Sequence, residues 1–123
     1  MDKMNILIAE DEAVNRIYFS RVLGKEGLSV DEASNGREAV AKALEKQYDL
    51  ILMDLKMPLL GGLEATEAIR KAETSRHTPI IALTSYSNPE DQARCRNAGM
   101  DAFLSKPLNN RQLLDMVRRY IKP

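Results

Sequence analysis

The sequence contains little cysteine, little histidine and no surplus of charge of either sign. Its single cysteine, Cys95, excludes an internal disulfide, and neither a second cysteine nor clustered histidines accompany it to form a metal site. Lysine plus arginine and aspartate plus glutamate number 18 each, so no overall positive charge favours direct binding to nucleic acid. No apolar N-terminal segment and no membrane-spanning run occurs, so no membrane partner is predicted and the expected location is the cytoplasm.

The chain is long enough for one domain with a real core and too short for two ordinary ones, so residues 1–123 are predicted to form a single domain. Short apolar runs alternate five times with longer amphipathic segments, which predicts an α/β fold with a five-stranded parallel sheet. Right-handed crossovers favour a doubly wound sheet in the order 2-1-3-4-5, with the polar second strand at an edge. The predicted strands are residues 4–9, 28–33, 50–53, 79–84 and 102–105.

The first helix is expected from about residue 13, with Val14, Ile17, Tyr18 and Val22 forming its apolar stripe. The stripes predicted for the second, third and last helices are Val40, Ala43 and Leu44; Ala65, Ala68, Ile69 and Ala72; and Leu113, Met116, Val117 and Tyr120.

The fourth helix has start and stop signals but few large apolar residues. Asn88 is its predicted N-cap, Pro89 its first residue and Gly99 its stop signal. Small residues, Ala93, Cys95 and Ala98, stand where leucine or isoleucine would be expected. We therefore predict a loosely held helix, suited to a switching surface.

Acidic residues follow two strands that are neighbours in the predicted sheet. Glu10, Asp11 and Glu12 come after the first strand, and Asp54 ends the third in the stretch DLILMDLKMP. Carboxyl ends of parallel strands share one rim, where ligands bind in open α/β sheets. Carboxylates so close together are costly unless one is protonated or a cation sits among them, and ligands that are all oxygen select a hard cation. We predict a Mg²⁺ site made by Asp11 and Asp54, with Glu10 close by.

Thr84 after the fourth strand and Lys106 after the fifth are expected at the same rim. Taken alone, Asp54 or Thr84 could cap a loop and Lys106 could extend into solvent. Together they suit one chemistry, in which a carboxylate attacks phosphorus, a cation and an ammonium neutralise the oxygens, and a hydroxyl hydrogen-bonds the product. The predicted product is an aspartyl phosphate on Asp54.

The blocks ILIAEDEAVNR, ILMDLKMPLLGG, PIIALTS and GMDAFLSKPL, in this order, resemble the receiver domain of two-component response regulators over essentially the whole chain. The resemblance implies that Asp54 is the phosphoacceptor, that Glu10 and Asp11 are the acidic pair serving Mg²⁺, and that the backbone carbonyl of Lys56 is a further metal ligand. It departs from the family's usual pattern at Glu10, where Asp is commoner, and at Gly61, where the loop often carries Asp.

The resemblance also implies a switch. Thr84 would move its hydroxyl to the phosphoryl group, Lys106 would pair with that group, and Phe103, where many relatives have tyrosine, would turn inward as Thr84 moves. The Lys106–Pro107 bond is cis in relatives. Lys56 and Tyr86 resemble variable positions that line access to the phosphoryl group, so we expect them to set its lifetime.

The leading hypothesis is a signalling module that takes a phosphoryl group from the phosphohistidine of a histidine kinase or a histidine phosphotransfer domain. It would catalyse only its own phosphorylation and dephosphorylation, and so is no enzyme in the ordinary sense. The resemblance implies an output face on the fourth helix, fifth strand and fifth helix, which would bind a downstream protein partner or form a homodimer. That face carries Arg94, Arg96, Arg111, Arg118 and Arg119.

Other functions stay open at this point. A receiver-like docking module that is never phosphorylated could afford to lose Asp54, Thr84 or Lys106, yet all are present. A flavin-binding protein of the flavodoxin-like fold needs a hydroxyl- and glycine-rich loop after the first strand, where this chain has acids. An aspartyl phosphatase more often has a second acid two residues after the nucleophile, where this chain has Lys56. A stand-alone regulator and a receiver belonging to a hybrid histidine kinase are both compatible with the sequence.

Overall fold

The computed structural model describes residues 4–73, 77–85 and 89–121. Within these residues the strands form one parallel sheet in the order β2-β1-β3-β4-β5, which confirms the predicted α/β class and strand order. The strands are β1 (Asn5–Ala9), β2 (Ser29–Ala33), β3 (Leu50–Asp54), β4 (Ile80–Thr84) and β5 (Ala102–Ser105). The helices are α1 (Ala13–Lys25), α2 (Gly36–Glu45), α3 (Gly62–Ala72), α4 (Pro89–Ala98) and α5 (Asn110–Tyr120). In the described part of the chain, no helix is both long enough and apolar enough to cross a bilayer.

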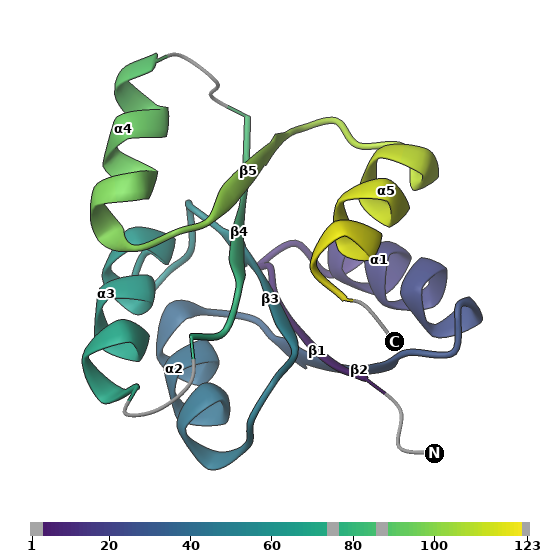
Figure 1. Ribbon diagram of the computed structural model, residues 1–123, viewed down its shortest axis with the longest axis horizontal. Coiled ribbons are helices and arrows are strands. Elements are labelled where there is room, and N and C mark those ends of the chain that lie inside the picture. The colour runs from purple at the N-terminus through teal and green to yellow at the C-terminus, as the bar shows by residue number, and fades with distance from the viewer. Residues whose placement is uncertain (1–3, 74–76, 86–88, 122–123) are drawn as a thin grey trace.

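Helices α1 and α5 cover one face of the sheet, and α2, α3 and α4 cover the other (Figure 1). Successive strand residues point to opposite faces, so each buried strand supplies both layers of the core. In β3, Leu50 and Leu52 pack toward α1 and α5, whereas Ile51 and Met53 pack toward α2 and α3. This two-sided burial explains why the central strands are continuous apolar runs.

The predicted core stripe of α1 is wrong at three of its four residues, and only Val22 is partly buried and packs against the core. Val14, Ile17 and Tyr18 are 79%, 44% and 41% exposed, and the residues buried against the sheet are Phe19 and Leu23. Apolar residues occur on two faces of this helix, so their spacing could not tell which face meets the sheet. The exposed apolar face becomes a surface that needs a functional explanation.

The other helices match their predicted stripes in part. The last residues of the stripes predicted for α2 and α3, Leu44 and Ala72, are exposed. The burial shifts toward the start of each helix, where Gly36 and Gly62 are buried. Glycine is required at both positions, because a Cβ on Gly36 would lie 1.9 Å from the carbonyl oxygen of Leu60, and one on Gly62 would lie 2.2 Å from that of Asp54. The start of α2 thus packs closely on Leu60, and the start of α3 packs closely on the end of β3. In α5, Leu113 and Val117 are buried as predicted.

Helix α4 begins at Pro89 and is followed by Gly99 in the left-handed region at φ 108°, as the stop signal predicted. The predicted N-cap, Asn88, lies outside the described residues. The buried residues of α4 are Cys95 and Ala98, which are small, so the helix packs through little apolar area. Loose attachment of α4 stays a prediction.

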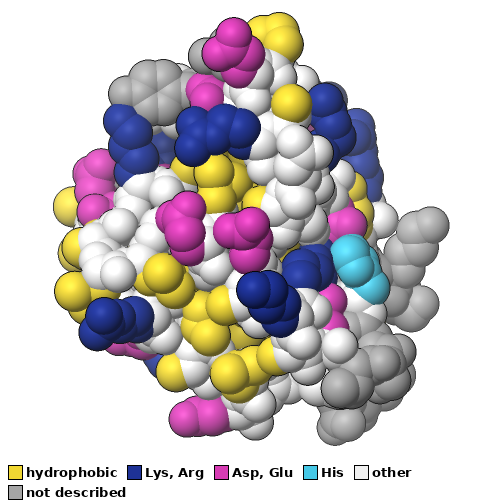
Figure 2. Space-filling model, turned by 90° about the vertical axis from the view of Figure 1, so that its left-hand side faces the viewer, with side chains coloured by type: hydrophobic (Ala, Val, Ile, Leu, Met, Phe, Trp, Pro, Cys, Tyr) yellow, Lys and Arg dark blue, Asp and Glu magenta, His cyan; other side chains and the backbone are white. Residues whose placement is uncertain are grey.

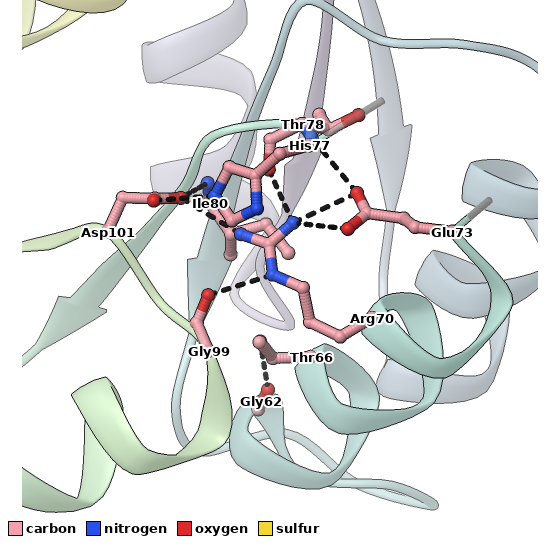
Figure 3. A network of polar contacts seen from close by, with 9 residues as sticks. All are labelled: Gly62, Thr66, Arg70, Glu73, His77, Thr78, Ile80, Gly99 and Asp101. Atoms are coloured by element: carbon pink, nitrogen blue, oxygen red, sulfur yellow. Dashed lines mark hydrogen bonds and ion pairs between the residues drawn. The ribbon is translucent and has the colours of Figure 1, made fainter. Parts of the chain in front are cut away.

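A polar network around Arg70 joins α3 to the turn after α4 and to the start of β4 (Figure 3). Its Nε donates to the carbonyl oxygen of Gly99 at 2.8 Å, and its two terminal nitrogens contact the carboxylates of Glu73 and Asp101, each at 2.9 Å. The single histidine, His77, also joins this network, with its Nε2 2.7 Å from Oδ1 of Asp101. The network fixes the C-terminal end of α4 against the body of the domain.

Candidate functional site

Three carboxylates meet at the carboxyl edge of the two central strands. Asp54 is the last residue of β3, and Glu10 and Asp11 directly follow β1, which pairs with β3. Each residue offers an oxygen, and these oxygens lie within 4.8 Å of one another. Glu10 and Asp54 are buried, whereas Asp11 is exposed. The structure therefore brings together the acids that the sequence predicted at this rim.

Lys106 lies between the two buried carboxylates. Its Nζ is 2.7 Å from Oε1 of Glu10 and 3.1 Å from Oδ2 of Asp54. The remaining oxygens are also engaged, because Oε2 of Glu10 accepts from the N–H of Glu12 at 3.2 Å and Oδ1 of Asp54 accepts from the N–H of Lys56 at 3.2 Å. The sequence predicted that Lys106 would reach this rim, but it gave no sign of its contact with Glu10.

The single ammonium of Lys106 faces a cluster of three acids. Burial, together with the neighbouring Asp54, raises the pKa of Glu10 above its usual value, although the hydrogen bond from Lys106 opposes the shift. Burial alone would lower the pKa of Lys106, but the hydrogen bond to Glu10 and the charge of Asp54 outweigh it and raise that pKa. The raised pKa of Glu10 means that burial beside Asp54 makes its carboxylate less favourable than in water, and a cation bound among these acids would oppose that shift.

The donor set fits Mg²⁺. The acidic cluster offers carboxylate oxygens without sulfur or nitrogen, and such ligands select a hard cation. Both oxygens of Glu10 and both oxygens of Asp54 already accept hydrogen bonds, whereas Asp11 is exposed, so Asp11 is the acid most accessible to a cation. The ligand set of Asp11 and Asp54, with Glu10 close by, stays a prediction.

A cavity of about 250 Å³ opens beside these acids. Its lining includes Asp54, Lys56, Thr84 and Lys106, together with Asp11, Glu12, Leu55 and Ser85. Thr84 ends β4 and is buried, and its carbonyl oxygen accepts from the N–H of Lys106 at 2.7 Å. The structure thus places the predicted Asp54, Thr84 and Lys106 around one space.

Phe103 lies apart from this cavity. Phe103 pairs with Ala82, and Thr84 pairs with Ser105. Phe103 and Thr84 therefore lie on the same face of neighbouring strands, two residues apart along them. Phe103 is half-buried and lines a second cavity, of about 290 Å³, with Cys95, Arg96 and Met100 at the packing of α4 on β5. The Lys106–Pro107 bond is cis, as the resemblance implied, and Tyr86 lies outside the described residues.

The sequence did not predict one side chain that contacts the acidic loop, residues 10–12 after β1. Arg16 of α1 donates to the backbone carbonyl of Glu10 at 2.8 Å. No signal in the sequence marked it, because an arginine in a helix is ordinarily a solvated surface residue.

Residues 6–118 match the response regulator receiver domain, so the chain belongs to this family. It is 32% identical to the polar-differentiation response regulator DivK of Brucella anthropi, covering 95% of each chain. It is 40% identical to hybrid signal transduction histidine kinase G of Dictyostelium discoideum over 96% of this chain, but it spans only 4% of that protein's length.

Solved receiver structures have the same fold. The receiver domain of sensor histidine kinase PA1611 from Pseudomonas aeruginosa, with magnesium in its active-site cleft, is 37% identical at a TM-score of 0.88, covering 97% of this chain and 98% of that one. The receiver of Saccharomyces cerevisiae Ssk1, solved with the histidine phosphotransfer protein Ypd1, is 32% identical at a TM-score of 0.88, covering 96% and 88%. The protein is therefore a receiver domain of two-component signalling, a phosphoacceptor module with an acidic pocket suited to Mg²⁺ and phosphorylation.

Proposed function

We propose that Asp54 accepts a phosphoryl group from the phosphohistidine of a histidine kinase or a histidine phosphotransfer domain. The observation that carries the proposal is the Asp54 carboxylate at the wall of the rim cavity, with the Lys106 ammonium 3.1 Å from its Oδ2. A carboxylate oxygen attacks phosphorus, the phosphorus–nitrogen bond of the donor breaks, and its electron pair stays on the imidazole. The product is an acyl phosphate on Asp54.

The neighbouring residues have separate roles in this transfer. Lys106 would pair with the negative charge of the phosphoryl oxygens, and the Thr84 hydroxyl would hydrogen-bond the product, which is supported by the presence of both residues in the lining of the cavity. Asp11, Asp54 and the backbone carbonyl of Lys56 would hold Mg²⁺, with Glu10 close by. When bound, Mg²⁺ supplies positive charge that offsets the negative charge of the transferred group.

The signal would leave through α4, β5 and α5. Movement of Thr84 toward the phosphoryl group would free space on the face of the sheet that Phe103 shares, so that Phe103 turns inward and alters the packing of α4. A downstream protein partner, or a second copy of this chain, would recognise the change. Acidic and basic side chains are interspersed on the side of α3 and α4 seen in Figure 2, which suits a protein partner better than nucleic acid.

The exposed apolar face of α1 is proposed as the docking surface for the phosphodonor. Val14, Ile17 and Tyr18 share one face of the helix, at positions i, i+3 and i+4. Tyr18 also lines one cavity with Lys106 and Pro107, so this face is continuous with the phosphorylation site. A protein that covers the rim to deliver a phosphoryl group would bury these side chains.

Phosphorylation of Asp54 and docking of the phosphodonor on α1 are tested separately. Intact mass after incubation with acetyl phosphate and Mg²⁺ should show one added phosphoryl group that is absent in Asp54→Asn and in EDTA. No gain by the folded wild-type chain would favour the alternative, a docking module that is never phosphorylated.

The donor surface is tested with the double variant Val14→Glu, Ile17→Glu. It should accept phosphate from acetyl phosphate like the wild type, but transfer from a histidine phosphotransfer protein that phosphorylates the wild type should fall roughly tenfold. An equal loss with both donors would show damage to the site rather than to docking.

Three further predictions belong to the proposal. A single receiver domain over residues 1–123 and a cytoplasmic location are still expected, because a histidine kinase delivers its phosphoryl group there. Lys56, which lines the rim cavity, and Tyr86 are expected to set the lifetime of the phosphoryl group. Both a DivK-like stand-alone regulator and a hybrid-kinase receiver fit this function.

A further inference from the structure

We propose that Arg16 is a positioning residue of the acidic site, which holds the backbone of Glu10 and Asp11 so that their carboxylates face a bound cation. The inference rests on the proposed Mg²⁺ ligands and adds a residue that contacts neither the cation nor the phosphoryl group.

Arg16 ties three segments together. Its Nη1 donates to the carbonyl oxygen of Glu10 at 2.8 Å and reaches that of Asp11 at 3.5 Å, while its Nε donates to Oε1 of Glu32 in β2 at 3.0 Å. Its own N–H bonds the carbonyl of Glu12, at the start of α1. The side chain is only 19% exposed, although it leaves a helix whose neighbouring apolar residues face solvent.

These carbonyls control where the carboxylates point. The N–H of Glu10 is held by the carbonyl of Ala33 at 3.0 Å, and Arg16 holds the carbonyl on the other side of the residue. Asp11 is exposed, so packing restrains its side chain little, and the position of its backbone decides where its Cα–Cβ bond points and hence which positions its carboxylate can reach. A cation site requires its ligands within about 0.5 Å and 10–20° of the working geometry.

Arg16 does not compete with a cation for the acids. It contacts their backbone carbonyls, and Glu32 balances its charge, whereas Lys106 contacts the carboxylates themselves. The guanidinium uses two nitrogens to reach two directions at once, which the single ammonium of a lysine cannot reproduce. Its expected effect is therefore on the affinity for Mg²⁺ and on the geometry of the acids, and not on the net charge of the site.

The test compares Arg16→Met and Arg16→Lys with Arg118→Met. Arg118 makes a similar pair with Glu26 at 2.7 Å, at the far end of α1 from the rim, and so controls for the loss of an arginine–glutamate contact. The dissociation constant for Mg²⁺ is measured by calorimetry, and the melting temperature is measured without Mg²⁺. Arg16→Met should weaken Mg²⁺ binding roughly tenfold, Arg16→Lys should weaken it less, and Arg118→Met should leave it within about twofold of wild type.

A dissociation constant for Arg16→Met within about twofold of wild type would overturn the proposal, even if its melting temperature fell, because Arg16 would then be only structural. If Arg16→Met does not fold, Arg16→Lys decides, and an unchanged constant for it overturns the proposal. Failure of the proposed function is distinguishable, because then the wild-type chain itself would not bind Mg²⁺ or gain a phosphoryl group.

Discussion

Replacing Arg70 by methionine should lower the free energy of unfolding more than the loss of an exposed ion pair would. Methionine keeps much of the apolar stem but removes every hydrogen bond of the guanidinium. These bonds reach the carbonyl oxygens of Gly99 and Thr78 and the carboxylates of Glu73 and Asp101 (Figure 3). The Arg70 side chain is 15% exposed, so water replaces those contacts only in part.

The loss of stability in Arg70→Met depends on which hydrogen bonds of Glu73 and Asp101 remain. Glu73 still accepts from the N–H of Thr78 at 2.9 Å, and Asp101 still accepts from the N–H of Ile80 at 2.8 Å, so neither carboxylate is left without a donor. Removing one partner of a fully buried pair costs about 3–5 kcal/mol, and an exposed pair contributes about 0–1 kcal/mol. This partly buried network lies between these limits, and we expect Arg70→Met to lower the free energy of unfolding by about 2–3 kcal/mol.

Urea unfolding followed by far-ultraviolet circular dichroism measures this loss, since the chain has no tryptophan to report it. Arg94→Met is the control, because Arg94 is 68% exposed and its nearest carboxylate oxygen, on Asp91, is 3.9 Å away. The control should change stability by less than about 0.5 kcal/mol. A loss below about 1 kcal/mol for Arg70→Met would refute the reasoning, because the network would then contribute no more than a surface pair.

Three further predictions concern single contacts. Tyr48→Phe removes the hydroxyl that donates to Asp31 at 2.7 Å and should cost about 1 kcal/mol at neutral pH. That hydrogen bond holds the pKa of Asp31 below its usual 3.8. Its contribution to stability is therefore complete above that value and is lost as the pH falls through the lowered pKa. A difference in stability between Tyr48→Phe and wild type that persists in strong acid argues against this cause. Lys106→Met leaves two buried carboxylates without their ammonium, so without Mg²⁺ it should lower the free energy of unfolding by about 3 kcal/mol. Saturating Mg²⁺ should then raise its melting temperature more than that of wild type, and an equal rise would contradict the role given to added charge. Gly62→Ala places a Cβ 2.2 Å from the carbonyl oxygen of Asp54 and should cost at least about 2 kcal/mol in urea unfolding. A loss below about 0.5 kcal/mol would mean that the helix start moves away freely.

The strands and the rim residues could be predicted from the sequence because both follow from local rules. Apolar runs located the strands, and right-handed crossovers favoured the order that the structure confirms. Carboxyl ends of parallel strands share an edge, so Asp54, Thr84 and Lys106 had to converge once the order was known. The family resemblance added roles for these residues that their positions alone do not supply.

The burial of α1 could not be predicted in the same way. Spacing shows which residues share a helix face, but two faces of α1 carry apolar residues, and only the packing on the sheet selected Phe19 and Leu23. The same packing left Val14 and Ile17 exposed on the face of α1 that they share with Tyr18, which lines a cavity with Lys106, and so made them candidates for donor docking.

The sequence by itself determined the class of fold, the edge of the sheet that carries the chemistry, and the residue types that meet there. Only the tertiary structure decided the contacts that set their charge and orientation: Lys106 on Glu10, Arg16 on the acidic loop, and Arg70 on the turn after α4. The physical reason is that such contacts depend on the angle at which whole elements pack and on the reach of long side chains. Lys106 and Glu10, 96 residues apart in the chain, meet at 2.7 Å for that reason alone.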